Sequence, residues 1–241
     1  MMFTKIINFL LIIILYSANL YGQAVKVLLE TTVKGLPEAK KFAYMEPLID
    51  TSNCTFITRI QSHEKNHKEV IEKMYFASRE KAMKMGCNGY RLNSFQRGGD
   101  HNDAYLILDC YYLSDSLLSV NFKAHEKNVF YIFGNEREGD DDCHFKLMGN
   151  EKILEAGMFY KLKPKEGETL ILNKGGSLGS TLHLTYDNTQ EAAFYSITGV
   201  KLSGMQKQLI TPGLAFELPG FERIYNISFG YLLALLLKEV D

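Results

Sequence analysis

Residues 68–95 read KEVIEKMYFASREKAMKMGCNGYRLNSF and combine a helix pattern with a strand pattern directly after it. Apolar and small side chains recur at three- and four-residue spacing, which predicts an amphipathic helix over 68–85. Asn66 is placed to cap the start of this helix, and Gly86 to end it. Residues 89–95 then alternate between the two faces of a strand. The residues on the buried face of the helix are expected to be Ile71, Met74, Tyr75, Ser78, Ala82 and Met85.

Two further strand patterns flank this stretch. Residues 54–60 are rich in β-forming side chains and partly alternate. Residues 104–113 are apolar and follow a glycine-containing turn at 97–102. The order strand, helix, strand, strand predicts a small βαββ domain over residues 51–113.

The rest of the chain has a different pattern. Residues 23–50 are interrupted by two prolines and are expected to form a lead-in segment with one or two strands. Residues 114–127 are expected to be a linker or a short helix. Residues 128–241 contain short strands separated by turn clusters, with the apolar stretch at 224–236 as a further strand, which predicts a β-sandwich domain. We therefore expect an α+β protein of two domains.

The first 22 residues have the order of a signal peptide for export. Met1–Lys5 carries one positive charge, Ile6–Tyr16 is apolar apart from Asn8, and small or polar residues follow up to Gly22. The apolar run is shorter than the about 20 residues of a membrane span, and an uncleaved N-terminal anchor is the alternative. We expect an exported protein that is periplasmic, associated with the outer membrane or secreted, with no transmembrane helix in its mature form.

Export also bears on the four cysteines, which are Cys54, Cys87, Cys110 and Cys143. An oxidising compartment favours disulfides, and the sequence leaves all pairings open. If the first two strands of the βαββ domain run parallel and the third returns, Cys54, Cys87 and Cys110 lie at one end of the sheet. We expect one disulfide between two of these three. The alternative is that the cysteines are small buried apolar side chains.

The composition is that of an ordinary globular protein. Hydrophobic residues make up 46% and charged residues 23%, which excludes disordered and fibrous classes. The formal net charge of −1 gives no general attraction to nucleic acid. The expected partner is an envelope protein or a ligand, with membrane association left open.

One stretch matches a zinc-binding pattern. His63-Glu64-Lys65-Asn66-His67 fits H-E-x-x-H, in which His63 and His67 would bind zinc on one face of a helix and Glu64 would act as the base. The polar residues around it differ from the buried helix that a zinc protease needs. A zinc-dependent hydrolase is therefore kept as an alternative, and no catalytic residues are expected.

An acidic stretch offers oxygen ligands for calcium. It comprises Asp140, Asp141 and Asp142 before Cys143 and His144, with Glu136 and Glu138 upstream. It lacks the alternating spacing of a calcium loop, so a solvated turn is favoured and no cofactor is expected.

Two segments resemble known bacterial families. Residues 80–90, EKAMKMGCNGY, resemble the helix-to-strand signature of small bacterial envelope βαββ domains, distantly including that of the Rcs-type stress-sensor lipoproteins. Cys87 and Gly89 stand where that pattern usually has alanines. Residues 128–199 resemble an uncharacterised β-sandwich domain of bacterial lipoproteins. The motifs behind this second resemblance are Met148–Glu151, Gly157–Tyr160, Pro164–Gly167 and Phe194–Tyr195. Both resemblances imply an envelope protein, and neither implies catalytic residues.

These expectations favour an exported, non-catalytic bacterial envelope protein with a binding, sensing or structural role. The alternatives are the zinc-dependent hydrolase and a structural subunit of a surface assembly, formed by strand addition at the edges of the sandwich.

Overall fold

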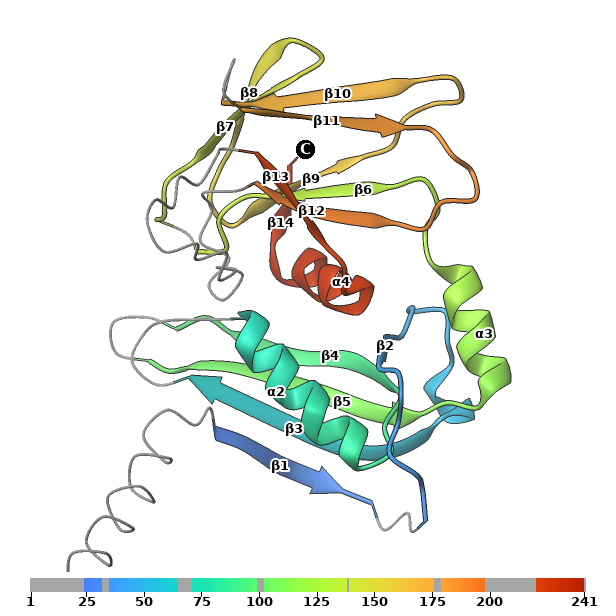
Figure 1. Cartoon of the computed structure of the whole chain (residues 1–241). Helices are drawn as coiled ribbons and strands as arrows, with labels where there is room; N and C mark the ends of the chain where they lie inside the picture. Colours follow the sequence, from blue (N-terminus) through green and yellow to red (C-terminus); the bar gives the residue numbers. More distant parts are fainter. Residues whose placement is uncertain are drawn as a thin grey trace, which may run out of the picture.

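A computed structural model describes residues 24–31, 35–64, 71–98, 102–137, 139–175, 179–197 and 220–240 (Figure 1). Within these ranges, three α-helices and fourteen strands in three sheets form an α+β fold, as predicted. The predicted export signal at residues 1–22 lies outside the described ranges, as does Asn66. No helix in the described part of the chain is long and apolar enough to cross a membrane.

The first sheet has five strands in the order β1-β3-β5-β4-β2. β5 lies between β3 and β4 and is antiparallel to both, so β3 and β4 run in the same direction. The predicted lead-in segment supplies β1 and β2, which form the two edges of this sheet. Its elements are β1 (Ala24–Glu30), β2 (Ala43–Tyr44), β3 (Thr55–Glu64), α2 (Ile71–Lys84), β4 (Gly89–Gln96) and β5 (Ala104–Tyr112), with a short 3-10 helix η1 (Thr51–Asn53) before β3.

Helix α2 packs on one face of this sheet through the side chains that the periodicity predicts. Ile71, Met74, Tyr75, Ser78 and Ala82 are all buried, whereas Met85, predicted on the same face, follows the end of the helix and is only half-buried. Gly86 follows the helix with a φ of 86°, a conformation that glycine adopts without strain. A Cβ at Gly86 would also lie 2.6 Å from the Cβ of Leu36, so the lead-in segment crosses close to the end of the helix.

The second half of the chain forms two sheets that face each other. One has the order β11-β10-β7-β8 and the other β13-β12-β6-β9-β14. Phe130 and Ile197 of the five-stranded sheet share a core with Phe145 and Leu172 of the four-stranded one. The strands are β6 (Phe130–Phe133), β7 (Cys143–Leu147), β8 (Asn150–Leu154), β9 (Met158–Leu162), β10 (Thr169–Lys174), β11 (Ser180–Thr185), β12 (Ala193–Ile197), β13 (Phe221–Ile224) and β14 (Lys238–Glu239).

The apolar stretch near the C-terminus is a helix, where the sequence predicts a strand. After β13 ends at Ile224, α4 runs over Ile227–Leu236, so the strand expected at 224–236 is wrong. The Asn226 side chain caps this helix by accepting a hydrogen bond from the Phe229 amide at 2.9 Å. Short apolar runs do not distinguish a strand from a buried helix by periodicity, and half of this helix is buried.

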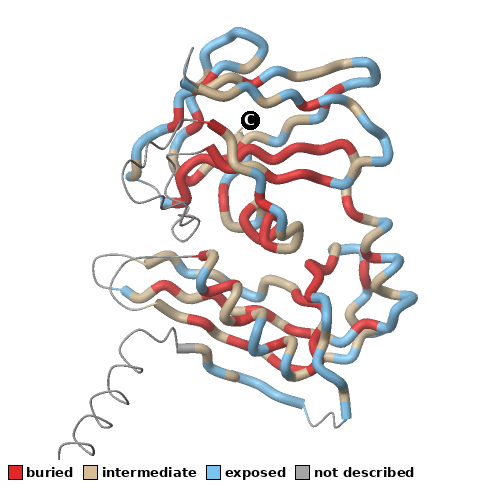
Figure 2. The backbone as a smooth tube through the Cα atoms, in the orientation of Figure 1, coloured by how far each residue is buried: buried red, intermediate tan, exposed pale blue. Residues whose placement is uncertain are grey.

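Helix α4 lies between the first sheet and the sandwich, where buried backbone is concentrated (Figures 1 and 2). Its residues Phe229 and Tyr231 belong to one continuous core with Tyr75 and Tyr90 on one side and Phe194 on the other. The first sheet therefore contains only strands that precede residues 114–127, and the other two sheets contain only strands that follow them. The hydrophobic core, in contrast, includes residues from both parts of the chain. The predicted linker contains α3 (Asp115–Ala124), capped by the Ser114 side chain.

Candidate functional site

None of the four cysteines forms a disulfide in the structure. All four thiols are free, with Cys87, Cys110 and Cys143 buried and Cys54 half-buried, so the expected disulfide is wrong. The strand register sets Tyr90 opposite Cys110 and leaves Cys87 before the start of β4, yet the Cys87 and Cys110 thiols lie close enough to interact with each other as free thiols. Burial raises the pKa of the Cys110 thiol well above its usual range, which disfavours the reactive thiolate.

The two predicted metal stretches are only partly described. His63 and Glu64 end β3, where the His63 ring stacks on Tyr105 with centroids 5.8 Å apart. Lys65, Asn66 and His67 lie outside the described residues, and so does Glu138. In the described part of the chain, no group of three or more His, Cys, Asp and Glu side chains is arranged to hold a metal ion.

The described acidic side chains near residue 140 have structural contacts. Asp142 accepts a hydrogen bond from the Ala156 amide at 3.1 Å. The buried Glu136 carboxylate accepts one from the Ile71 amide at 3.2 Å, at the start of the described part of α2. A carboxylate in that position accepts a hydrogen bond from a main-chain amide that has no partner within the helix, and its charge is favourable at the positive end of the helix dipole.

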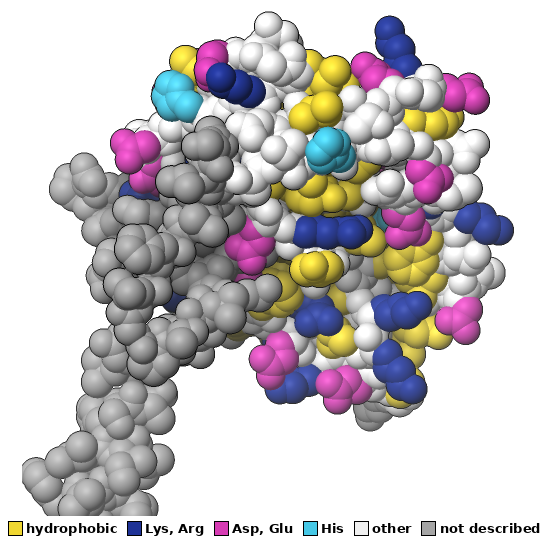
Figure 3. Space-filling model, turned by 45° about the horizontal axis from the view of Figure 1, so that its top comes forward, with side chains coloured by type: hydrophobic (Ala, Val, Ile, Leu, Met, Phe, Trp, Pro, Cys, Tyr) yellow, Lys and Arg dark blue, Asp and Glu magenta, His cyan; other side chains and the backbone are white. Residues whose placement is uncertain are grey.

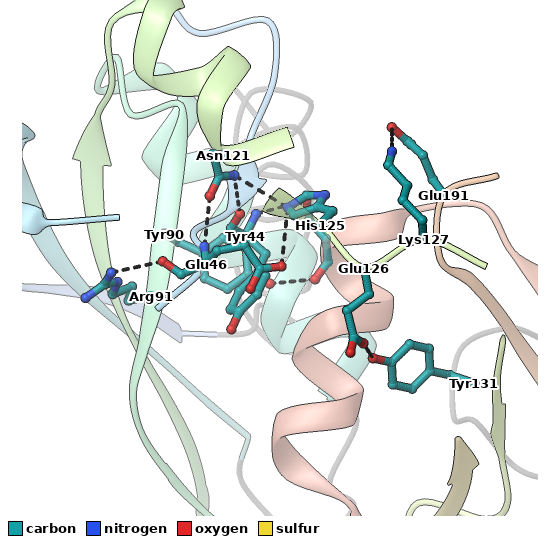
Figure 4. A network of polar contacts seen from close by, with 11 residues as sticks. Tyr44, Glu46, Tyr90, Arg91, Asn121, His125, Glu126, Lys127, Tyr131 and Glu191 are labelled. Atoms are coloured by element: carbon teal, nitrogen blue, oxygen red, sulfur yellow. Dashed lines mark hydrogen bonds and ion pairs between the residues drawn. The ribbon is translucent and has the colours of Figure 1, made fainter. Parts of the chain in front are cut away.

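A buried polar cluster, which we call the junction network, lies where β2, α3 and α4 meet (Figure 4). Asn121 of α3 is fully buried and joins the elements. Its Oδ1 accepts a hydrogen bond from the Glu46 amide at 2.8 Å, and its Nδ2 donates to the Tyr44 carbonyl at 2.7 Å. Arg91 of β4 holds the same segment from the other side by donating to the Glu46 carbonyl at 3.1 Å. The network therefore fixes α3 to the edge of the first sheet.

Two titratable groups face each other inside the junction network. His125 Nε2 lies 3.9 Å from Glu46 Oε1, and the two side chains are 2% and 15% exposed. Glu46 Oε1 is buried and has no hydrogen-bond partner among the described residues. Burial is the main cause that lowers the pKa of His125 and raises the pKa of Glu46. Both shifts favour the uncharged form of each group.

Aromatic rings surround this pair and connect it to the sandwich. Tyr231 of α4 stacks on Tyr44 with centroids 5.0 Å apart and approaches the His125 ring at 4.9 Å. Further out, the Tyr131 hydroxyl donates to Glu126, which also pairs with Lys161 at 2.8 Å. The buried imidazole is therefore sealed behind tyrosine rings and is not open to a substrate.

An open groove runs along the side of α3 that faces the lead-in segment, and we call it the α3 groove. It has a volume of about 930 Å³ and lies between residues 37–41 and α3. Its floor consists of Tyr112, Leu118 and Phe122. The Phe122 ring also contacts the His125 ring edge-on at 5.6 Å, so the groove and the junction network share a wall.

Charge is arranged unevenly along the α3 groove. Asp115 stands in the first turn of α3 and Lys123 in the last turn, with Lys41 held over the Phe122 ring at 5.8 Å. Lys127 pairs with Glu191 at 3.5 Å at the same end. Lys41 and Lys123 have no ion-pair partner among the described residues. The end of the groove near residue 123 therefore has free positive charge beside an apolar floor.

Neither the junction network nor the α3 groove was predicted from the sequence. Asn121 lies in α3 and His125 is the residue that follows its end, four positions further on, which is a weak signal for a shared face. Their partners Tyr44, Glu46 and Tyr231 come from distant parts of the chain, and nothing local points to them. On the face drawn in Figure 3, acidic and basic side chains are interspersed, in keeping with the small net charge.

The pKa shifts predict how stability depends on pH. Folding lowers the pKa of His125 below 6.5. The contribution of His125 to the free energy of unfolding is therefore complete above pH 6.5 and is lost as the pH falls. Glu46 acts in the opposite sense, since its raised pKa favours the fold when the carboxyl is protonated. The unmodified protein should have a lower free energy of unfolding at about pH 5 than at about pH 7. In the His125→Gln variant this difference should be smaller, as measured by urea denaturation at both pH values.

The matched control for that prediction is His144→Gln, which changes an exposed histidine of β7. It should keep the pH dependence of the unmodified protein. An equal pH dependence in the unmodified protein and the His125→Gln variant would contradict the assignment.

Comparison with known protein families, with characterised proteins and with solved structures finds no match for this chain. The fold and the candidate site therefore define it as an α+β protein with a buried polar junction beside an open apolar groove.

Proposed function

We propose that this chain is an exported, non-catalytic bacterial envelope protein that binds a ligand in the α3 groove. The groove carries the proposal, because its volume of about 930 Å³ falls within the range of small-molecule sites. Its walls come from the lead-in segment, from α3, from the end of the first sheet at Tyr112, and from Lys127 and Glu191. The export signal predicted at residues 1–22 supports placing the protein in the envelope.

The chemistry of the groove favours a ligand with an apolar body and one acidic group. Leu118 and Phe122 offer apolar contact along the floor. Lys41 and Lys123 offer charge to an acidic group at one end, about 12 Å along the helix from Asp115. A carboxylate or sulfonate on an apolar chain or ring would satisfy both parts at once.

A binding role also agrees with the position of His125, the side chain that would best suit acid–base catalysis. His125 is 4% exposed and lies behind Phe122 and Tyr231, so it supports the wall of the groove without reaching into it. A ligand bound against Phe122 would contact a ring that itself packs on His125.

The direct test uses decanoate as the probe, titrated calorimetrically into the mature protein. We expect binding of decanoate, weaker binding of decanol, and a loss of affinity of about tenfold in Phe122→Ala, which removes apolar contact worth about 1.4 kcal/mol. Lys123→Gln should weaken decanoate and leave decanol unchanged.

Val120→Ala is the control, since Val120 is 49% exposed on α3 and does not line the groove. It should bind decanoate like the unmodified protein. Absence of decanoate binding, or equal affinity in the Phe122→Ala variant, would overturn the proposal.

A further inference from the structure

A second hollow lies in the sandwich half, on the side where β11 leads through a loop into β12. It has a volume of about 560 Å³. We call it the sandwich mouth, and the residues that matter to its chemistry are Phe130, Thr185, Tyr186, Asp187, Gln190 and Tyr195. It shares no lining residue with the α3 groove.

The loop between β11 and β12 forms one wall of the sandwich mouth, and hydrogen bonds to the buried Asn128 hold it in place. Asn128 is buried, and its Oδ1 accepts a hydrogen bond from the Asp187 amide at 3.1 Å. The Asn128 amide donates to the Gln190 carbonyl at 2.8 Å, and the Asn128 Nδ2 donates to the Pro164 carbonyl at 2.9 Å. The backbone of the loop is thus fixed before any ligand arrives, which reduces the entropy lost on binding.

Asp187 supplies an ionised acceptor at the sandwich mouth. Its Oδ1 accepts hydrogen bonds from the Thr189 hydroxyl at 2.7 Å and the Thr189 amide at 2.8 Å. These bonds orient the carboxylate and lower the pKa of Asp187. Both bonds use the same carboxylate oxygen, so Oδ2 can still accept a hydrogen bond from a ligand hydroxyl.

The remaining lining combines aromatic rings with neutral hydrogen-bonding groups. Tyr186 and Tyr195 are both half-buried, so part of each ring is exposed to a ligand. Thr185 and Gln190 add a hydroxyl and an amide, each able to donate and to accept. No lysine or arginine is present among the described lining residues, and His183 is their one basic side chain, so the hollow lacks the lysine and arginine groups that usually bind a phosphate or a nucleotide.

We propose that the sandwich mouth binds a neutral saccharide. The polarised C–H face of a pyranose ring packs on the electron-rich face of a tyrosine ring. Its hydroxyls, each a donor and an acceptor, match Asp187, Gln190 and Thr185. This site is independent of the α3 groove and would bind a ligand of different chemistry.

The test uses three neutral disaccharides, cellobiose, maltose and diacetylchitobiose, observed by saturation-transfer difference NMR with the mature protein. At about 10 mM, above a dissociation constant of about 1 mM, at least one should show transfer to its ring protons. Tyr195→Ala should reduce its affinity about tenfold, and Gln190→Ala should reduce it with little risk to folding.

Two control variants test whether the sugar binds at the sandwich mouth itself. Tyr225→Ala removes a tyrosine that is 78% exposed and outside the mouth, and should leave binding unchanged. Phe122→Ala, which alters the α3 groove, should also leave saccharide binding unchanged. No transfer to any of the three sugars, or unchanged affinity in both Tyr195→Ala and Gln190→Ala, overturns the proposal.

Discussion

Replacing Gly230 by alanine is expected to lower the free energy of unfolding by about 3 kcal/mol. A Cβ at this position of α4 would lie 2.3 Å from Cγ of Phe194 and 2.5 Å from Cδ2, well inside van der Waals contact. Phe194 is completely buried and cannot swing into solvent. In an exposed helix the same change would stabilise by about 1 kcal/mol, so the contact with Phe194 reverses the expected sign.

Urea denaturation of the Gly230→Ala variant measures this effect. Gly98→Ala is the matched control, because a Cβ there would meet Ala104 at an ordinary 3.4 Å, and it should change stability by less than about 0.5 kcal/mol. Adding Phe194→Leu to Gly230→Ala should cost less than the sum of the two single changes, since the smaller side chain removes part of the clash. A stability of Gly230→Ala equal to that of the unmodified protein would mean that α4 does not press on the sandwich in this way.

Asn121→Ala is expected to cost about 2–3 kcal/mol of unfolding free energy. The change removes the acceptor for the Glu46 amide and the donor for the Tyr44 carbonyl in one step. Both main-chain groups belong to the segment that forms the edge of the first sheet, and Asn121 itself is completely buried. A buried polar group left without a partner keeps its full desolvation cost, which is why the loss exceeds that of an ordinary hydrogen bond.

The control for Asn121→Ala is Asn173→Ala, in β10, whose side chain donates to the Thr181 hydroxyl at 2.9 Å in an exposed setting. Water replaces that partner, so the control should lose less than about 0.5 kcal/mol. Since Asn121 does not line the α3 groove, the folded Asn121→Ala protein should still bind decanoate. Equal stabilities of the two asparagine variants would show that the junction network does not hold α3.

The βαββ order illustrates what local pattern can determine. The buried face of α2 was predictable because a helical period repeats within one segment and needs no knowledge of its partner. The two-residue β2 is one of the strands expected in the lead-in segment, but its place at the edge of the sheet was not predictable. That place depends on pairing with β4, more than forty residues further along the chain.

The two wrong predictions differ in their origin. The 224–236 stretch is apolar on all sides, so it carries no period that separates a strand from a buried helix. The disulfide prediction placed Cys87 and Cys110 at one end of the sheet, and the structure brings these two thiols together in the core but leaves them free. For the helix, the missing information was which distant surface the segment packs against.

The sequence by itself determined the α+β class, the helix and strands around residues 55–112, and an ordinary globular charge balance. These follow from periodicity and composition, which act within short segments. Only the tertiary structure decided that α4 joins the first sheet to the sandwich, and that Glu46, Asn121 and His125 meet inside it. The α3 groove and the sandwich mouth likewise exist only after distant segments pack, because burial and long-range hydrogen bonds depend on partners that no local pattern encodes.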